Sequence, residues 1–228
     1  MKKFLKLLTI VIIVLFSFGI SKSAEPIIEK KEPVKEVIKK EEVVEEPEEE
    51  SDSDIVGTIY IPDTEFKATI TQTTDNVYYL NHGIDGKSLA KGNPFLDFRD
   101  SVTKTKTLRI YGHNSRTIHT EFHILEGYYK EKFYKQHPYI YFETNKKTMK
   151  FQIFASYIEA KDWSYYNANF NDVEVYKNEL AKYKKKSIYD TGVEVTENDR
   201  ILILQTCSYD KRYSKYKNKY LLIMAKEV

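Results

Sequence analysis

The sequence has a single cysteine and a single tryptophan among its 228 residues, with only 8 glycines and 6 prolines. One cysteine cannot form a disulfide within the chain, and it also excludes a cysteine-rich zinc site. The glycine and proline contents exclude a collagen-like chain, and 41% apolar residues exclude a chain that is disordered throughout. Long apolar runs recur nowhere, so the chain is not a multi-span membrane protein. The length suits one domain with extensions.

The chain also lacks a strong net charge, which is only +2, but this total hides a split along the sequence. Residues 1–24 carry four lysines and no acidic residue. Residues 25–54 carry 13 acidic and 5 basic side chains, so that segment is strongly negative. The remaining residues 55–228 carry a small positive excess. The composition therefore divides the chain into three parts.

Residues 1–24 have the pattern of an export signal or a membrane anchor. Lys2, Lys3 and Lys6 precede a mainly apolar run over residues 7–20. A positive start followed by such a run is typical of a secretory segment, and the run is short for a spanning helix. Small residues follow it, so both cleavage and retention as an uncleaved anchor are possible. In either case we expect the lysines on the cytoplasmic side and the remaining chain outside.

Residues 25–54 are rich in Glu, Lys, Pro and Val and contain no glycine or aromatic residue. Such a segment cannot bury enough apolar surface to offset the entropy lost on ordering. We therefore expect an extended, disordered tether that is stiffened by its own charge. The alternative is an amphipathic helix over residues 34–44, where apolar residues show partial helical spacing.

Residues 55–228 alternate between short apolar segments and turn residues, a pattern typical of strands. The expected strands are 55–61, 68–72, 94–98, 107–111, 139–144, 149–157, 200–206 and 220–225. The expected helices are 128–136 and 173–186, the second with apolar residues on one face. About eight short strands with two or three peripheral helices predict a mainly β domain built as a closed or nearly closed barrel.

Cys207 directly follows an apolar strand, and His113 follows another one after Gly112. Nucleophilic cysteine chemistry needs a thiolate, a histidine for proton transfer and a donor for the developing oxyanion. If the two strands are neighbours, their ends bring His113 and Cys207 together, and Gly112 would allow a sharp backbone turn that aims the imidazole. The alternative is a chemically quiet, buried cysteine.

Other clusters favour structural roles. His119 and His123 have the spacing of two ligands on one helix face, but no cysteine or aspartate cluster completes a metal site, so no metal or other cofactor is expected. The lysines within 182–186 are typical of a solvated helix end, and an exported protein has little opportunity to bind nucleic acid. Trp163 and the nearby tyrosines at 165 and 166 are interpreted as core residues.

Taken together, several segments resemble class B sortases. The segments are 57–62 (GTIYIP), 75–82 (DNVYYLNH), 108–114 (LRIYGHN), 133–142 (FYKQHPYIYF), 186–192 (KSIYDTG) and 202–207 (LILQTC). They occur in the family's order and span nearly all of residues 55–228. The resemblance implies an eight-stranded sortase β-barrel.

The resemblance also implies a membrane-anchored, extracellular cysteine transpeptidase. Cys207 would attack the Thr–Gly type carbonyl of a C-terminal sorting signal on a surface protein and form a thioester. His113 would protonate the leaving amine and later deprotonate an amino group of peptidoglycan, which takes over the acyl group. A thioester stores the acyl energy, so the reaction needs no ATP or metal.

The chain departs from the family at its third catalytic residue, an arginine near the start of the last strand. Lys219 stands immediately before that strand, and Arg212 is the only arginine in the preceding loop. We assign the catalytic cation to Arg212, with Lys219 as the alternative that would also contact substrate. Asn114 and Thr206 are expected to shape the substrate site.

Gln205 is a second departure, because class B relatives often have serine at that position. Two other functions stay open. One is a cysteine peptidase that hydrolyses its substrate, and the other is a degenerate, non-catalytic module that binds the cell wall.

Overall fold

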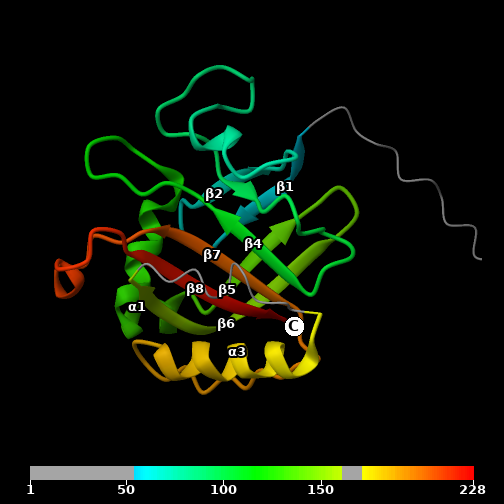
Figure 1. Cartoon of the computed structure of the whole chain (residues 1–228), viewed down its shortest axis with the longest axis vertical. Coiled ribbons are helices and arrows are strands. Elements are labelled where there is room, and N and C mark those ends of the chain that lie inside the picture. Colours follow the sequence, from blue (N-terminus) through cyan, green and yellow to red (C-terminus); the bar gives the residue numbers. More distant parts are fainter. Residues whose placement is uncertain (1–53, 161–170) are drawn as a thin grey trace, which may run out of the picture. The chain divides into compact units, whose positions relative to one another are not determined.

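A computed structural model describes residues 54–160 and 171–228 (Figure 1). Within these ranges eight strands close into a barrel in the order β1-β2-β3-β4-β7-β8-β6-β5, which confirms the predicted fold class. The strands are β1 (Ile55–Tyr60), β2 (Lys67–Thr71), β3 (Phe95–Leu96), β4 (Thr107–Tyr111), β5 (Tyr139–Glu143), β6 (Thr148–Glu159), β7 (Ile201–Cys207) and β8 (Tyr220–Glu227). The pairs β2–β3 and β4–β7 are parallel, and the other pairs are antiparallel. The central strands β4 and β7 therefore end at the same rim of the barrel.

Strand β7 is buried on both of its faces, which explains its nearly continuous apolar sequence. Leu202 and Leu204 point into the main core inside the barrel. Ile201 and Ile203 alternate with them and pack in a second cluster under helix α3 (Val173–Lys186). Figure 1 shows α3 lying across the outside of the barrel. Its packing fixes β7 from the side opposite the barrel interior.

Helix α3 has the bounds that the sequence pattern predicts. Its buried residues Tyr176, Leu180 and Tyr183 share one face, and the side chain of Asp172 caps its first turn by accepting a hydrogen bond from the amide of Val175. The lysines at its end form ion pairs with nearby glutamates, such as Lys186 with Glu159. These contacts favour the interpretation of the lysine cluster as a solvated helix end.

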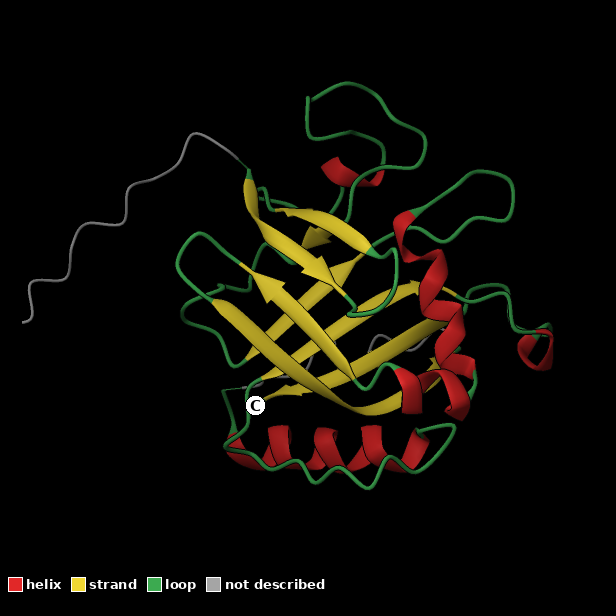
Figure 2. Ribbon diagram, turned by 180° about the vertical axis from the view of Figure 1, so that it is seen from behind, coloured by secondary structure: helices red, strands yellow, loops and turns green. Residues whose placement is uncertain are grey.

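The second predicted helix, 128–136, is wrong in its bounds. A 3₁₀ helix, η2 (Glu121–Tyr129), is followed by a short α1 (Glu131–Gln136), and the extended residue Lys130 separates them (Figure 2). The buried residues of η2 are Phe122, Leu125 and Tyr128, which recur every three residues. A 3₁₀ helix has three residues per turn, so a search for the α-helical period of 3.6 does not detect it.

Asp54, the last residue of the predicted tether, bonds to residues of the catalytic domain. The carbonyl of Asp54 accepts a hydrogen bond from the amide of Gln72 at 2.8 Å, and its carboxylate accepts one from the hydroxyl of Tyr79 at 2.7 Å. The expected anchor (1–24), the tether up to residue 53, and Trp163 with its tyrosine neighbours lie outside the described residues. Within the part that is described, no helix is long and apolar enough to cross a membrane.

Candidate active site

The parallel ends of β4 and β7 place His113 and Cys207 at one rim of the barrel. Tyr111 pairs with Gln205, and one residue further the amide of Gly112 donates to the carbonyl of Gln205 at 3.1 Å. The two strand ends are therefore held side by side directly below the two candidate catalytic residues. Both His113 and Cys207 line one cleft of about 650 Å³.

The cleft wall is mainly aromatic and aliphatic, with a few polar groups at the strand ends. Its lining side chains include Leu80, Phe95, Tyr111 and Tyr220. None of the described residues that line it is a lysine, an arginine or a carboxylate. The cleft therefore suits an extended, largely uncharged segment of a ligand. Uncharged hydrogen-bond donors would hold this segment at the reacting atoms.

Burial raises the pKa of the Cys207 thiol above the ordinary value of a cysteine. At neutral pH the group is therefore mainly a thiol and not the nucleophilic thiolate. A nucleophilic role needs a base that takes the proton during the reaction. The imidazole of His113 in the same cleft is the group that can do so.

The imidazole of His113 is oriented by a backbone carbonyl. Its Nε2 atom lies 2.8 Å from the carbonyl oxygen of Leu80, in the short helix η1 (Tyr78–Leu80). A carbonyl oxygen only accepts hydrogen bonds, so Nε2 must carry the proton and donate it. In the neutral ring, Nδ1 is then the basic nitrogen. The loop that holds Leu80 is thus part of the site, although the sequence reasoning did not single it out.

Gly92 lets that loop approach closely. Its φ of +57° lies in the left-handed region, and a Cβ atom there would lie 2.3 Å from the carbonyl oxygen of Tyr79 and 2.8 Å from that of Leu80. Any larger residue at this position would displace the carbonyl that orients His113. In the sequence this glycine is visible only as part of a turn.

Gly112 is needed for a different reason from the one that the sequence predicts. Its φ is not in the left-handed region, so it makes no turn that other residues cannot make. Instead, a Cβ atom would lie 2.6 Å from the ring of Phe122, which packs against the backbone at this point. The glycine therefore allows η2 to pack against the strand end that carries His113.

Asn114 connects the end of β7 with η2, and its side chain is buried. Its Nδ2 group donates to the carbonyl oxygen of Cys207 at 3.0 Å and to the carboxylate of Glu126 at 2.8 Å. Both partners are acceptors, which fixes the amide orientation, so Oδ1 accepts from Nδ1 of His123 at 2.8 Å.

Thr206, another predicted site residue, lines the cleft and donates from its hydroxyl to the carbonyl of Gly112 at 2.8 Å. Asn114 and Thr206 thus hold the His113 and Cys207 backbones together.

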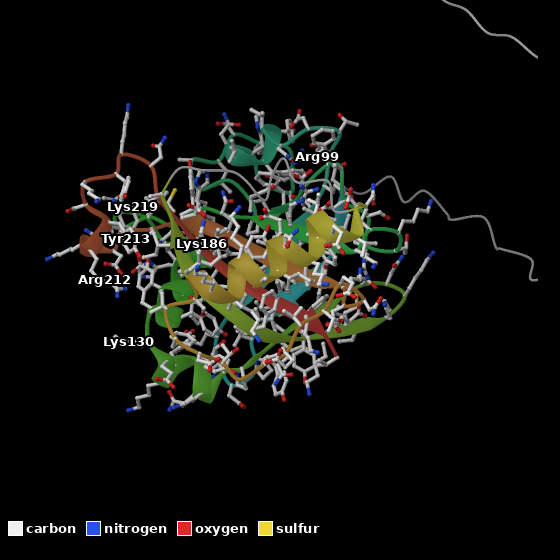
Figure 3. All side chains as sticks on the ribbon, turned by 60° about the horizontal axis from the view of Figure 1, so that its bottom comes forward. Arg99, Lys130, Lys186, Arg212, Tyr213 and Lys219 are labelled. Atoms are coloured by element: carbon white, nitrogen blue, oxygen red, sulfur yellow. The ribbon has the colours of Figure 1, made fainter. Side chains whose placement is uncertain are left out.

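Neither predicted cation lines the cleft. Arg212 lies on the short helix η3 (Lys211–Tyr213), where its side chain is 60% exposed and its Nε donates to the carboxylate of Asp210 at 2.9 Å. Figure 3 shows Arg212 and Lys219 at the edge of the molecule, on the connection from β7 to β8. Lys219 offers its carbonyl to the amide of Ser208 at 2.9 Å. The structure therefore brings His113, Cys207, Asn114 and Thr206 together and leaves the two cations outside the group.

A closed, mainly β barrel with a cysteine and a histidine at adjacent strand ends is the arrangement expected of the family that the sequence resembles. Residues 59–228 match the sequence profile of the sortase domain. The chain belongs to the sortase family, and its relatives place it in class B.

The relatives are sortase B proteins. Sortase B of Listeria monocytogenes is 34% identical over 163 residues, which is 71% of this chain and 66% of the relative. The solved Staphylococcus aureus sortase B–substrate complex has a TM-score of 0.68 and 30% identity, and the match covers 77% of this chain and 80% of that one. A sortase B solved with triglycine has a TM-score of 0.69 and 31% identity, with 77% and 80% coverage. The chain thus spans just under two thirds of the Listeria relative's length.

Proposed function

We propose that this protein cleaves the sorting signal of surface proteins and transfers the resulting acyl group to an amino group of peptidoglycan. The single observation that carries the proposal is the cleft in which His113 and Cys207 meet at the ends of two paired strands. A solved relative that holds a substrate, and another that holds triglycine with its α-amino group, are consistent with both halves of this reaction.

In the first half, the proton of the Cys207 thiol passes to the imidazole of His113, and the sulfur attacks the carbonyl carbon of the scissile peptide bond. The C–S bond forms and the carbonyl oxygen becomes an oxyanion. The C–N bond then breaks, and the imidazolium of His113 gives its proton to the leaving amine. The product is a thioester on Cys207.

In the second half, an amine attacks the thioester carbonyl and gives its proton to His113. The C–S bond breaks, the sulfur of Cys207 takes back a proton from the imidazolium of His113, and the new amide leaves the enzyme. The acyl group stays activated in the thioester, so its transfer to the amine needs no further source of energy. The family's third catalytic residue is an arginine near the start of the last strand. Our assignment of that role to Arg212 stays a prediction, because Arg212 lies outside the cleft in this structure.

The N-terminal pattern supports the same function. Lysines followed by an apolar run, and then a charged segment, would keep the catalytic domain outside the membrane and within reach of the wall. The test is membrane fractionation of the full chain, together with protease treatment of intact cells. A domain that is protected from external protease would refute the extracellular placement.

The reaction is tested with a peptide pool in which threonine is followed by each of the other residues, with and without triglycine. Mass spectrometry should detect a peptide thioester on Cys207, and the acyl group should move to triglycine when it is present. The Cys207→Ala variant should form no adduct, because the chain has no second thiol. Release of free acid at the same rate with and without triglycine would identify a peptidase, and failure of the wild type to react would favour the non-catalytic alternative.

A further inference from the structure

The side chain of Tyr220 lies opposite the candidate nucleophile. In the antiparallel ladder of β7 and β8, Cys207 is paired with Tyr220. The next pair outward, Ser208 with Lys219, is joined by a 2.9 Å hydrogen bond from the Ser208 amide. Hydrogen-bonded and non-hydrogen-bonded pairs alternate in such a ladder, so Cys207 and Tyr220 form a pair of the second kind. Side chains of these pairs rise from the same face and are close neighbours, with Cα atoms about 4.5 Å apart.

Both side chains also line the cleft. Successive residues of a strand point to opposite faces, so Lys219, one position earlier, is directed away from the face that carries Cys207. Arg212 is exposed and bound to Asp210 on η3. Among the described residues, the place opposite the nucleophile is therefore taken by a phenol and not by a cation.

A tyrosine hydroxyl is a hydrogen-bond donor as long as it stays protonated. Burial, together with the nearby Cys207 thiolate, raises the pKa of Tyr220 above that of an ordinary tyrosine. A raised pKa means that the phenol keeps its proton at neutral and mildly alkaline pH. The group is therefore a neutral donor under the conditions in which a thiolate attack takes place.

We infer that the hydroxyl of Tyr220 is a catalytic donor, which hydrogen-bonds to the substrate carbonyl oxygen as that oxygen becomes an oxyanion. The inference rests on the proposed acyl transfer and adds the residue that stabilises its transition state. No proton is transferred from Tyr220, because the oxyanion returns its electrons to the carbonyl when the C–N bond breaks. The same oxyanion forms when the amine attacks the thioester, so Tyr220 acts in both halves of the reaction.

The test compares Tyr220→Phe, which removes only the hydroxyl, with Tyr213→Phe at the end of the neighbouring helix η3. Acylation by the threonyl peptide pool and transfer to triglycine are followed by mass spectrometry. Loss of one oxyanion donor lowers the rate constant by on the order of 10²-fold, and we expect this for Tyr220→Phe with little change in KM. Tyr213→Phe should keep the wild-type rate, and Arg212→Ala and Lys219→Ala should lose less than Tyr220→Phe.

Alkylation of Cys207 by iodoacetamide separates a catalytic role from a structural one. In this reaction the sulfur displaces iodide at a methylene carbon and no oxyanion forms. The rate of alkylation should therefore be the same in wild type and Tyr220→Phe. A Tyr220→Phe variant that is acylated as fast as wild type overturns the inference, as does one in which alkylation falls as much as acylation. If instead Arg212→Ala is the crippled variant, the arginine is the donor and the inference is wrong. A wild-type protein that is not acylated at all refutes the proposed transpeptidation, which is a separate result.

Discussion

Replacing Asn114 with alanine should weaken both the stability of the barrel rim and the rate of the reaction. The side chain is only 4% exposed and makes three hydrogen bonds, to Cys207, Glu126 and His123. A typical intramolecular hydrogen bond contributes about 0.5–1.5 kcal/mol net, and partners left unsatisfied add to the cost of losing it. We therefore expect Asn114→Ala to lower the free energy of unfolding by about 2–4 kcal/mol.

His123→Ala is the matched control, because it removes one of these three bonds and leaves the link to Cys207 intact. It should cost about 1 kcal/mol. The free energies are measured by urea unfolding of the domain. The two losses should not add in the double variant, because His123 and Asn114 share one of the bonds.

The kinetic consequence follows from the bond to the Cys207 carbonyl. Without it, the strand end that carries the nucleophile can shift relative to His113, and a misplacement of about 1 Å can cost on the order of 10²-fold in rate. We expect the kcat/KM of Asn114→Ala to fall at least tenfold at a temperature where the variant is fully folded, and that of His123→Ala to fall less. Wild-type stability and rate in Asn114→Ala would refute this account of the rim.

His113→Ala should lower the rate of acyl transfer by about 10²–10⁴-fold, while peptide binding, measured by fluorescence anisotropy, is kept. If His113→Ala keeps the wild-type rate and His119→Ala is inactive, the histidine assignment is wrong. Because burial raises the pKa of Cys207, its thiolate fraction should keep growing with pH beyond about 8.5, the pKa at which the thiolate fraction of an ordinary cysteine begins to level off. The rate of alkylation by iodoacetamide should therefore rise about tenfold per pH unit to beyond pH 8.5. A rate that reaches a plateau below that pH would contradict the burial argument. Deletion of residues 1–53 should give a soluble, active domain, and an inactive deletion variant would show that the domain boundary is misplaced. Asp54→Ala in the full chain should lower the melting temperature, because it removes the carboxylate that accepts a hydrogen bond from the Tyr79 hydroxyl.

The sequence alone was enough to predict the class of fold, and it singled out two residues that the structure brings to one cleft. Among the described residues, apolar segments located the eight strands of the barrel. A strand with one buried face alternates between apolar and polar residues, and a strand buried on both faces reads as a short apolar run. Helix α3 was found because its buried residues follow the helical period over four turns. His113 and Cys207 were singled out because each lies at the end of such a strand and in a segment that resembles the family, and their catalytic roles stay predictions. The sequence could not reveal η2, whose period of three matches neither pattern.

The tertiary structure decided which side chains meet around these two residues. The carbonyl that orients His113 comes from Leu80 on a loop 33 residues away, and no local pattern marks a carbonyl as a partner. Gly112 looked like a turn residue, but the approach of Phe122 is what requires it. The choice among Arg212, Lys219 and Tyr220 depends on the register of β7 against β8, since a shift of one residue exchanges the faces of a strand. Pairing across strands is a property of the closed barrel, and therefore only the folded structure places a phenol opposite the cysteine.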